Sequence, residues 1–366
     1  MKNLLVWLTQ DANSAKHTSG WAHPIAACLT HYVISCFSIW LFHDAFLIPL
    51  FLKENDEIPP LGSLSLCPME AKSSASGKSF WVACGSFIYA ILLLIIRLTS
   101  NSPGIHRFAV LYELTWLCNA ALLFGATFGL LTCRPRIATG FAIAVSIDQI
   151  LWYVDVIGYT YNVLSKKKKM FPVGVCQYLI WPQTQWSAKI TCTHHFWTIP
   201  LLVYGAGGID WGSYIMNIVM VLVFVVLSRW LTPFGLKPIS SAPNRMLREI
   251  ADYNTPAKSR GAGTSEAPKQ PAPIVSLGCL PPLGGSSSRQ TKKNAKRPRF
   301  EKYLNVNLSH ELWQDIKVPI LRRHGDNQTM PVYILRLNLW WSFFNLLCFL
   351  LLKGIEIIIV TAWGSS

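Results

Sequence analysis

The amino-acid sequence predicts an all-α fold, a polytopic integral membrane helical bundle with about seven transmembrane helices. The 366 residues are 51 % hydrophobic and only 14 % charged, and the mean hydropathy is +0.33. A soluble domain usually carries about 25 % charged residues, so this composition excludes a single soluble globule and a wholly disordered chain. The apolar residues gather in segments of about 20 residues or more, at 25–48, 80–98, 108–132, 137–164, 190–209, 212–231 and 340–363.

These segments divide the chain into five parts. Residues 1–24 are expected to form a cytosolic arm, and 25–239 a six-span membrane bundle with mostly short connections. Residues 240–300 are rich in Pro, Gly, Ser and Lys and predict a disordered basic insert, because few apolar side chains are present to order it. Residues 301–339 predict a juxtamembrane amphipathic segment that lies on the membrane. Residues 340–366 hold the last transmembrane helix and a short tail.

The basic residues predict the orientation of the chain in the membrane. Lys166 to Lys169 form a run between two spans, and residues 232–330 carry 16 Lys and Arg against 7 Asp and Glu. With seven spans both regions lie on one side, and the positive-inside rule makes that side cytosolic. The N-terminus is therefore expected in the cytosol. The sequence does not identify the organelle whose membrane holds the protein. The sequons at Asn307 and Asn327 fall on the same side, and we interpret them as chance.

The same basic loops indicate the expected partners. Next to membrane spans, the run KKNAKRPR (residues 292–299) favours anionic lipid headgroups, and no nucleic acid is expected. The other expected partner is membrane lipid itself. Ten cysteines show no CxxC pair, which argues against a disulfide framework or a structural zinc site. We expect no cofactor and no metal, because the spacing is not diagnostic in the one ligand set considered, His31, Asp148 and either His194 or His195.

Ionisable and polar side chains inside membrane spans are candidates for a functional site, because burying them in lipid is costly. Three consecutive spans each present a polar face at helical spacing, with Thr115, Cys118 and Asn119 on the first, Asp148, Trp152, Asp155 and Tyr159 on the second, and Thr191, His195 and Thr198 on the third. Spans joined by short loops are usually neighbours, so a shared polar interior is expected.

Simpler interpretations exist for these groups. A span threonine usually bonds to its own backbone, and a span histidine often serves as an interhelical hydrogen-bond partner. An aspartate of the second face can lie in the headgroup region at the end of its span, but Asp148 is too central for this interpretation to cover both. Lys353 and Glu356, three residues apart, fit mutual neutralisation.

Two stretches resemble a known family. They are YELTWLCNAALLFG (residues 112–125) and HFWTIPLLV (195–203), and the next span ends in RWLTPF. Over about residues 80–235 the chain resembles the androgen-induced-protein family of multi-pass membrane threonine hydrolases, which cleave fatty acid esters of hydroxy fatty acids. One position departs from the family pattern, since Cys118 stands where the family usually has Asp or Asn.

The resemblance implies a catalytic pair. Thr115 matches the family's nucleophile and His195 its partner histidine. A threonine hydroxyl needs a base to take its proton, and histidine is suited to that role near neutral pH. Asn119 is a candidate donor to the oxyanion, and Asp148 or Asp155 is a candidate for orienting His195. The expected substrate is a lipid ester that enters from the bilayer.

Two other functions remain open from the sequence. Glu113, Asp148, Asp155 and His195 also suit a transporter of a small solute or of protons, although no internal repeat is apparent. The third is a non-catalytic membrane scaffold, in which the basic insert recruits lipid or a partner.

Overall fold

The computed structural model describes residues 23–51, 74–99, 108, 110–165, 171–173, 176–180, 186–233, 235–236, 302–303, 306–309 and 329–363. Within these ranges the regular structure is helical apart from one pair of two-residue strands, so the all-α prediction is confirmed. Four helices are long and apolar enough to cross a membrane, and a helix pair bent by 50° makes five if it counts as one span. The chain is therefore a polytopic integral membrane protein built as a helical bundle.

The described part of the chain contains more elements than expected spans. Its first half forms α2 (Pro24–Phe42), η2 (His43–Leu47), α3 (Ile48–Phe51), α4 (Ser74–Thr99), α5 (Val110–Leu114), α6 (Leu117–Ala120), η4 (Ala121–Gly129), α7 (Pro135–Ala144) and α8 (Ser146–Leu164). Its second half forms η5 (Gln177–Ile180), α9 (Trp186–Thr191), α10 (His194–Ala206), α11 (Trp211–Leu231), β1 (Gly235–Leu236), β2 (Lys302–Tyr303), η6 (Val306–Leu308) and α13 (Met330–Trp363). The two strands pair antiparallel, and η2 and η4 are π-helical.

Several helix ends follow from local sequence. Proline occupies the first turn of α2 and of α7, where its missing N–H costs nothing. Asp210 and Ser213 form a capping box that starts α11. Gly207 adopts the left-handed conformation (φ 79°) that ends α10.

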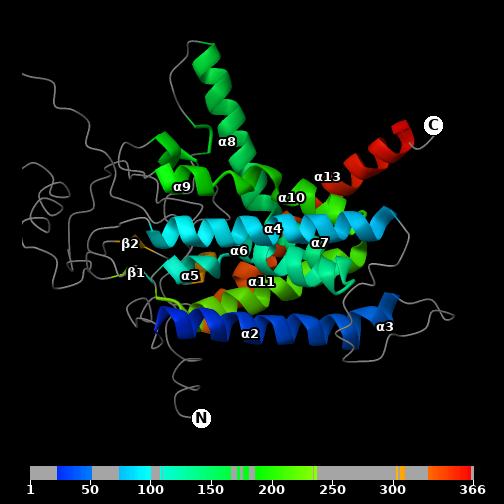
Figure 1. Cartoon of the computed structure of the whole chain (residues 1–366), viewed down its shortest axis with the longest axis horizontal. Coiled ribbons are helices and arrows are strands. Elements are labelled where there is room, and N and C mark those ends of the chain that lie inside the picture. Colours follow the sequence, from blue (N-terminus) through cyan, green and yellow to red (C-terminus); the bar gives the residue numbers. More distant parts are fainter. Residues whose placement is uncertain are drawn as a thin grey trace, which may run out of the picture.

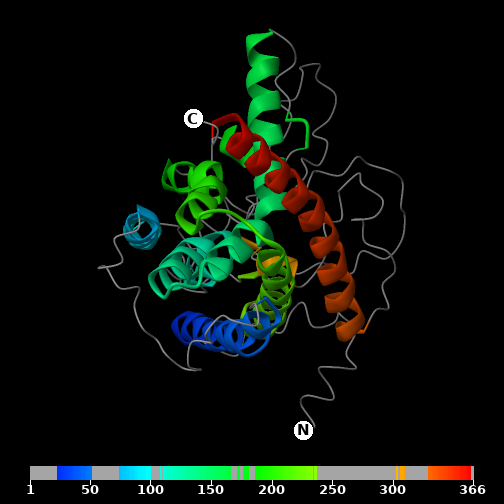
Figure 2. The ribbon, with the colours of Figure 1, turned by 90° about the vertical axis from the view of Figure 1, so that its right-hand side faces the viewer.

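Most of the long helices run side by side along the long axis of the molecule. α2, α4, α7 and α11 lie roughly parallel in Figure 1, and α2 and α4 are seen nearly end-on in Figure 2. α8 projects away from the bundle, and α13 slants across it. α11 is central, since it packs against α2, α7 and α13.

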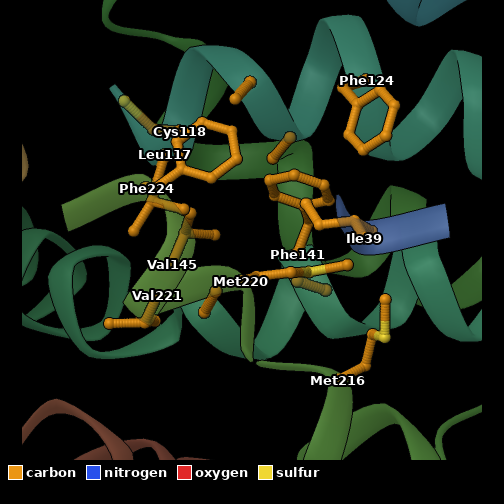
Figure 3. Close-up of a cluster of buried hydrophobic side chains, with 14 of the residues drawn as sticks. Ile39, Leu117, Cys118, Phe124, Phe141, Val145, Met216, Met220, Val221 and Phe224 are labelled. Atoms are coloured by element: carbon orange, nitrogen blue, oxygen red, sulfur yellow. The ribbon is translucent and has the colours of Figure 1, made fainter. Parts of the chain in front are cut away.

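The core lies where α11, α7 and η4 meet. Phe141 of α7 packs edge-on against Phe224 of α11 and Phe124 of η4, with ring centroids 5.6 and 5.5 Å away (Figure 3). Gly125 permits the close approach of η4 to α7, because a Cβ there would lie 2.9 Å from the Phe141 side chain. Such small residues are typical of helix contacts in membranes.

The outer surface of the bundle is strongly apolar. On α2, Val33 and Phe37 are exposed while His31 and Ser35 are buried. This arrangement suits a helix whose outer face contacts lipid, because lipid offers no partners to polar groups. It places the polar side chains of the span in the interior of the bundle.

Three expected spans differ from continuous helices. Segment 108–132 is interrupted between α5 and α6, segment 137–164 bends at Val145, and segment 190–209 is divided between α9 and α10. Interrupted helices expose backbone N–H and C=O groups that need other partners. At the first two interruptions the structure supplies such partners from segments far away in the sequence, as described below.

The end of the chain also differs from the prediction. α13 begins at Met330 rather than at residue 340, because Met330, Tyr333 and Leu337 pack against the core and extend the helix. Where the structure describes the segment 301–329, β2 is followed by η6, whose residues are buried in the bundle rather than lying on a surface. The arm at 1–22 and the insert at 240–300 lie outside the described residues.

The described cysteines are mostly reduced. Cys133 is disulfide-bonded, whereas reduced thiols are found at Cys28, Cys36, Cys84, Cys118, Cys176, Cys192 and Cys348. The expectation of no disulfide framework therefore needs one correction, at Cys133. The reduced thiols include Cys118, which belongs to the site described next.

Candidate functional site

The first feature of the site is a break in the expected third span. Between α5 and α6, Trp116 adopts an extended backbone (φ −62°, ψ 138°). The prediction that Thr115 shares one helix face with Cys118 and Asn119 is therefore wrong, because the helix does not continue through Trp116. Asn119 instead reaches back across the break, where its Nδ2 donates to the carbonyl of Glu113 at 2.7 Å.

Thr115 lies in the turn at this break and is fully buried. Its Oγ1 donates to the carbonyl of Tyr112 at 2.7 Å. A hydroxyl has one proton, so in this structure Thr115 gives it to the backbone and not to His195. This is the behaviour usual for threonine in a membrane helix.

A side chain from a remote segment closes the break. Asn307, in η6, accepts from the N–H of Leu117 at 2.9 Å and donates to the carbonyl of Thr115 at 2.9 Å. The same amide donates to Ser228 of α11. One side chain therefore satisfies both a backbone donor and a backbone acceptor that the broken helix leaves open.

Asn307 is also the first residue of a sequon. It is fully buried and has a left-handed backbone (φ 53°), a conformation that asparagine tolerates better than most residues. A glycan on its amide nitrogen would disrupt the hydrogen bonds to Thr115 and Ser228. The burial agrees with interpreting this sequon as chance.

A buried ion pair adjoins the break. Arg97 of α4 donates to Glu113 of α5 with Nη1 and Oε2 2.8 Å apart, and both side chains are almost completely buried. The same guanidinium donates to Oγ1 of Thr191 at 3.3 Å. The ion pair therefore links α4 and α5 to the end of α9.

Two adjacent buried histidines begin α10. Because α9 ends at Thr191 and α10 begins at His194, the polar face predicted for Thr191, His195 and Thr198 is divided between two helices. The rings of His194 and His195 lie 4.2 Å apart between centroids, and their exposed fractions are 1 % and 2 %. His194 Nδ1 contacts the carbonyl of Thr191 at 2.5 Å. A carbonyl only accepts, so Nδ1 carries the proton and Nε2 the lone pair. His195 also lies beside Trp152 of α8, 6.2 Å between ring centroids.

Cys118 completes this group of side chains. One ligand atom each from Cys118, His194 and His195 lie within 4.8 Å of one another, and all three side chains are buried. We call these three residues the Cys–His–His cluster. They come from α6 and α10, two elements that are separated by more than 70 residues of sequence.

Several polar atoms on the surrounding elements lack a hydrogen-bond partner. On α6, α8 and α10 these buried atoms are Asn119 Oδ1, Gln149 Oε1 and Nε2, Trp152 Nε1 and His194 Nε2. Buried polar groups are normally paired, so unpaired ones indicate a water, an ion or a ligand that binds there. Unpaired buried atoms also occur elsewhere in the described part of the chain, for example on α11 and α13. Those on α6, α8 and α10 lie on the elements that carry the Cys–His–His cluster and its neighbour Trp152, which makes this polar interior the candidate functional site.

The two aspartates of α8 have different surroundings. Asp148 is in the first turn of the helix, just after the bend. Asp155 is fully buried, and its two carboxylate oxygens accept from the backbone N–H groups of Val173 and Cys176 at 2.6 and 2.9 Å. Asp155 thus holds a neighbouring loop.

Other ionisable residues of the spans have structural partners. Both ring nitrogens of His31 are hydrogen-bonded, to Ser228 and to Ser35 at 3.2 Å each. His31 is not a member of the Cys–His–His cluster, so the metal-ligand group considered from sequence differs from the observed one. Lys353 pairs with Glu356 at 2.7 Å, as their spacing predicts.

A second buried ion pair lies near the C-terminal end of the first expected span, residues 25–48. Arg134, just before α7, donates to the two carboxylate oxygens of Asp44 in η2 at 2.9 and 2.7 Å. His43 Nδ1 lies 2.8 Å from the same carboxylate. This bidentate contact ties η2 to the start of α7 and gives Asp44 a structural role.

Three residues around the site carry more weight than sequence reasoning assigns to them. From sequence, Cys118 belongs to a polar face and departs from a family pattern, Asn307 belongs to a sequon interpreted as chance, and Arg97 is assigned no role. Each acts through a contact between residues distant in sequence, and no local spacing signals such contacts. The adjacent histidines are the local signal, because two ionisable residues in succession are rare in a span.

In comparisons with known proteins, no family model, no curated protein and no solved structure matches this chain.

Proposed function

We propose that the protein is a membrane-embedded hydrolase that cleaves fatty-acyl esters of lipids at the Cys–His–His cluster. The observation that carries the proposal is the pair of adjacent buried histidines, one of which has an unpartnered Nε2. An imidazole can take a proton and return it, which ester hydrolysis requires. A neutral imidazole is also less costly to bury than a carboxylate.

The acidic residues favour hydrolysis over transport. A proton or solute pathway needs carboxylates that exchange partners during the cycle. Glu113 is tied to Arg97, and Asp155 holds two backbone N–H groups. Of the three carboxylates considered for transport, two therefore have fixed structural partners.

The proposal has two chemical routes. In the route that the family resemblance implies, Thr115 is the nucleophile and His195 the base, and Thr115 has to exchange its bond to Tyr112 for one to the base. In the other route a water molecule is the nucleophile, and Thr115 keeps its bond to the backbone. A fluorophosphonate probe separates them, since covalent labelling that Thr115→Ala abolishes supports the first route only.

The test of the proposal itself is hydrolysis by the purified full chain. The wild type in mixed micelles is expected to hydrolyse fluorogenic acyl esters, and His195→Ala is expected to lower the rate by about 100-fold or more. His31→Gln is the matched control, because His31 is equally buried but bonded to serines on another interface. It should retain the wild-type rate. Absence of hydrolysis across short, medium and long acyl chains, or an unaffected His195→Ala rate, would refute the proposal.

A further inference from the structure

We propose that Cys118, His194 and His195 form a binding site for a zinc ion. The three side chains offer one sulfur and two imidazole nitrogens, a ligand set that zinc prefers in proteins. Their ligand atoms already lie within 4.8 Å of one another. Ligands of a tetrahedral zinc ion lie about 3.5 Å apart, so zinc binding would draw the three ligand atoms closer together by about 1 Å.

The protonation of His194 suits a metal ligand. Its Nδ1 donates to the carbonyl of Thr191, which fixes the ring and directs the lone pair of Nε2 away from that carbonyl. Metal-bound histidines almost always have such a second hydrogen bond to a carbonyl or carboxylate. Nε2 is buried and has no partner among the described protein atoms. An ion at this position explains both observations.

The buried ion pair supports this arrangement from outside the cluster. Arg97 holds Oγ1 of Thr191, and Glu113 neutralises the guanidinium. Thr191 is therefore fixed by α4 and α5 as well as by its own helix. Because the carbonyl of Thr191 orients His194, the ion pair positions a ligand that it does not touch.

Three protein ligands leave the fourth tetrahedral position open, as in catalytic zinc sites. Zinc binding itself does not depend on the proposed hydrolase, but its use in catalysis rests on that proposed function. In the hydrolase, a zinc ion held by Cys118, His194 and His195 would lower the pKa of a bound water and so would favour the water route. The two histidines would then act as zinc ligands and not as the base of the Thr115 route.

The first experiment measures metal in the purified full chain. After incubation with zinc and removal of the excess, the wild type is expected to hold about one zinc ion per chain. Cys118→Ala and His194→Ala should each lower that content by about tenfold. Cys28→Ala is the matched control, since Cys28 is another buried thiol and is not in the cluster. A wild type without zinc, or a Cys118→Ala variant with full content, would overturn the inference.

A second measurement guards against variants that only misfold. Cobalt(II) bound to a thiolate gives a charge-transfer band in the near ultraviolet, and the wild type loaded with cobalt should show it. Cys118→His should keep the metal but lose this band, because a nitrogen replaces the sulfur. A band that persists in Cys118→His would place the metal elsewhere and overturn the inference.

The zinc site and the hydrolase fail in distinguishable ways. Zinc binding without ester hydrolysis would support the site and refute the proposed function. Hydrolysis that survives complete zinc removal would support the function and refute the role of the metal in it.

Discussion

Two helix interruptions in the same bundle are stabilised in different ways. At the break between α5 and α6 the backbone of Trp116 is extended, and Asn307 binds both an N–H and a C=O group. At the bend between α7 and α8 the backbone of Val145 departs less from helical values (φ −96°, ψ −2°), and its N–H still bonds to Phe141.

The second interruption therefore leaves fewer backbone groups that need a hydrogen-bond partner from another segment. There the carbonyl of Ala144 accepts from two remote side chains, Trp341 at 2.9 Å and Asn345 at 3.3 Å, both on α13. The comparison teaches that a larger backbone departure leaves more groups to be satisfied from elsewhere. It also shows that one remote amide serves two groups at the first break, whereas two donors share one group at the second. The first break is therefore the more vulnerable.

The largest effect is expected from the ion pair beside the first break. Arg97→Met leaves the Glu113 carboxylate buried without its guanidinium, which we expect to lower the free energy of unfolding by about 3–5 kcal/mol. Thermal unfolding in detergent, followed by tryptophan fluorescence, measures the loss. The double variant Arg97→Met with Glu113→Gln should recover a large part of it, and no recovery would mean that the unpaired carboxylate is not the cause.

Removal of the single amide at the first break should have the next largest effect. Asn307→Ala leaves the N–H of Leu117 and the carbonyl of Thr115 without their partner, at an expected cost of about 2–4 kcal/mol. The same unfolding measurement applies. If Asn307→Ala lowered the free energy of unfolding by no more than the Trp341 variant described next, the first break would not be the more vulnerable of the two interruptions.

The second interruption should tolerate the loss of one donor. Trp341→Phe keeps most of the packing volume, and Asn345 continues to donate to Ala144, so the expected cost is about 1 kcal/mol. Combining Trp341→Phe with Asn345→Ala should cost more than the two single changes added together. Simple additivity would show that the two donors do not substitute for each other.

The smallest effect is expected near the other end of α7, away from both interruptions. Arg136 there pairs with the half-exposed Asp210 at 2.6 Å. Burial raises the pKa of Asp210, but the hydrogen bonds from Ser213 and Arg136 outweigh it and hold the pKa below its ordinary value. The stabilisation is therefore fully present above about pH 4 and is lost as the pH falls through the lowered pKa.

Asp210→Asn tests this because asparagine also caps helices well. We expect the variant to be less stable than the wild type by about 0.5–1 kcal/mol at neutral pH, and the difference to vanish in acid. Unfolding curves of both proteins from neutral pH down to about pH 2 give the comparison. A difference that grows as the pH falls would contradict the assigned direction.

The helical membrane architecture is predictable from sequence because lipid imposes it. Long apolar runs such as the one that forms α11 have no other stable form in a bilayer. The interruptions are not predictable in the same way, because Trp116 and Val145 lie in runs that are mostly apolar. Their geometry depends on Asn307 and on α13, which lie far along the chain.

The candidate site is predictable in part. The adjacent histidines and Asp148 stand out because ionisable residues are costly in a span. The prediction that Thr115 and Asn119 share one helix face assumes a continuous helix. The helix is broken between them, and both side chains donate to backbone carbonyls instead. Asp155 is a sequence candidate for orienting His195, and in the structure its oxygens hold a loop.

The position of Asn307 has a consequence for biosynthesis. The ribosome completes Leu117 190 residues before it reaches Asn307. At about 5–20 residues per second this interval lasts about 10–40 s. Until then the N–H of Leu117 and the carbonyl of Thr115 lack the amide that joins them across the break. The final geometry of this span can therefore form only after most of the chain has been synthesised.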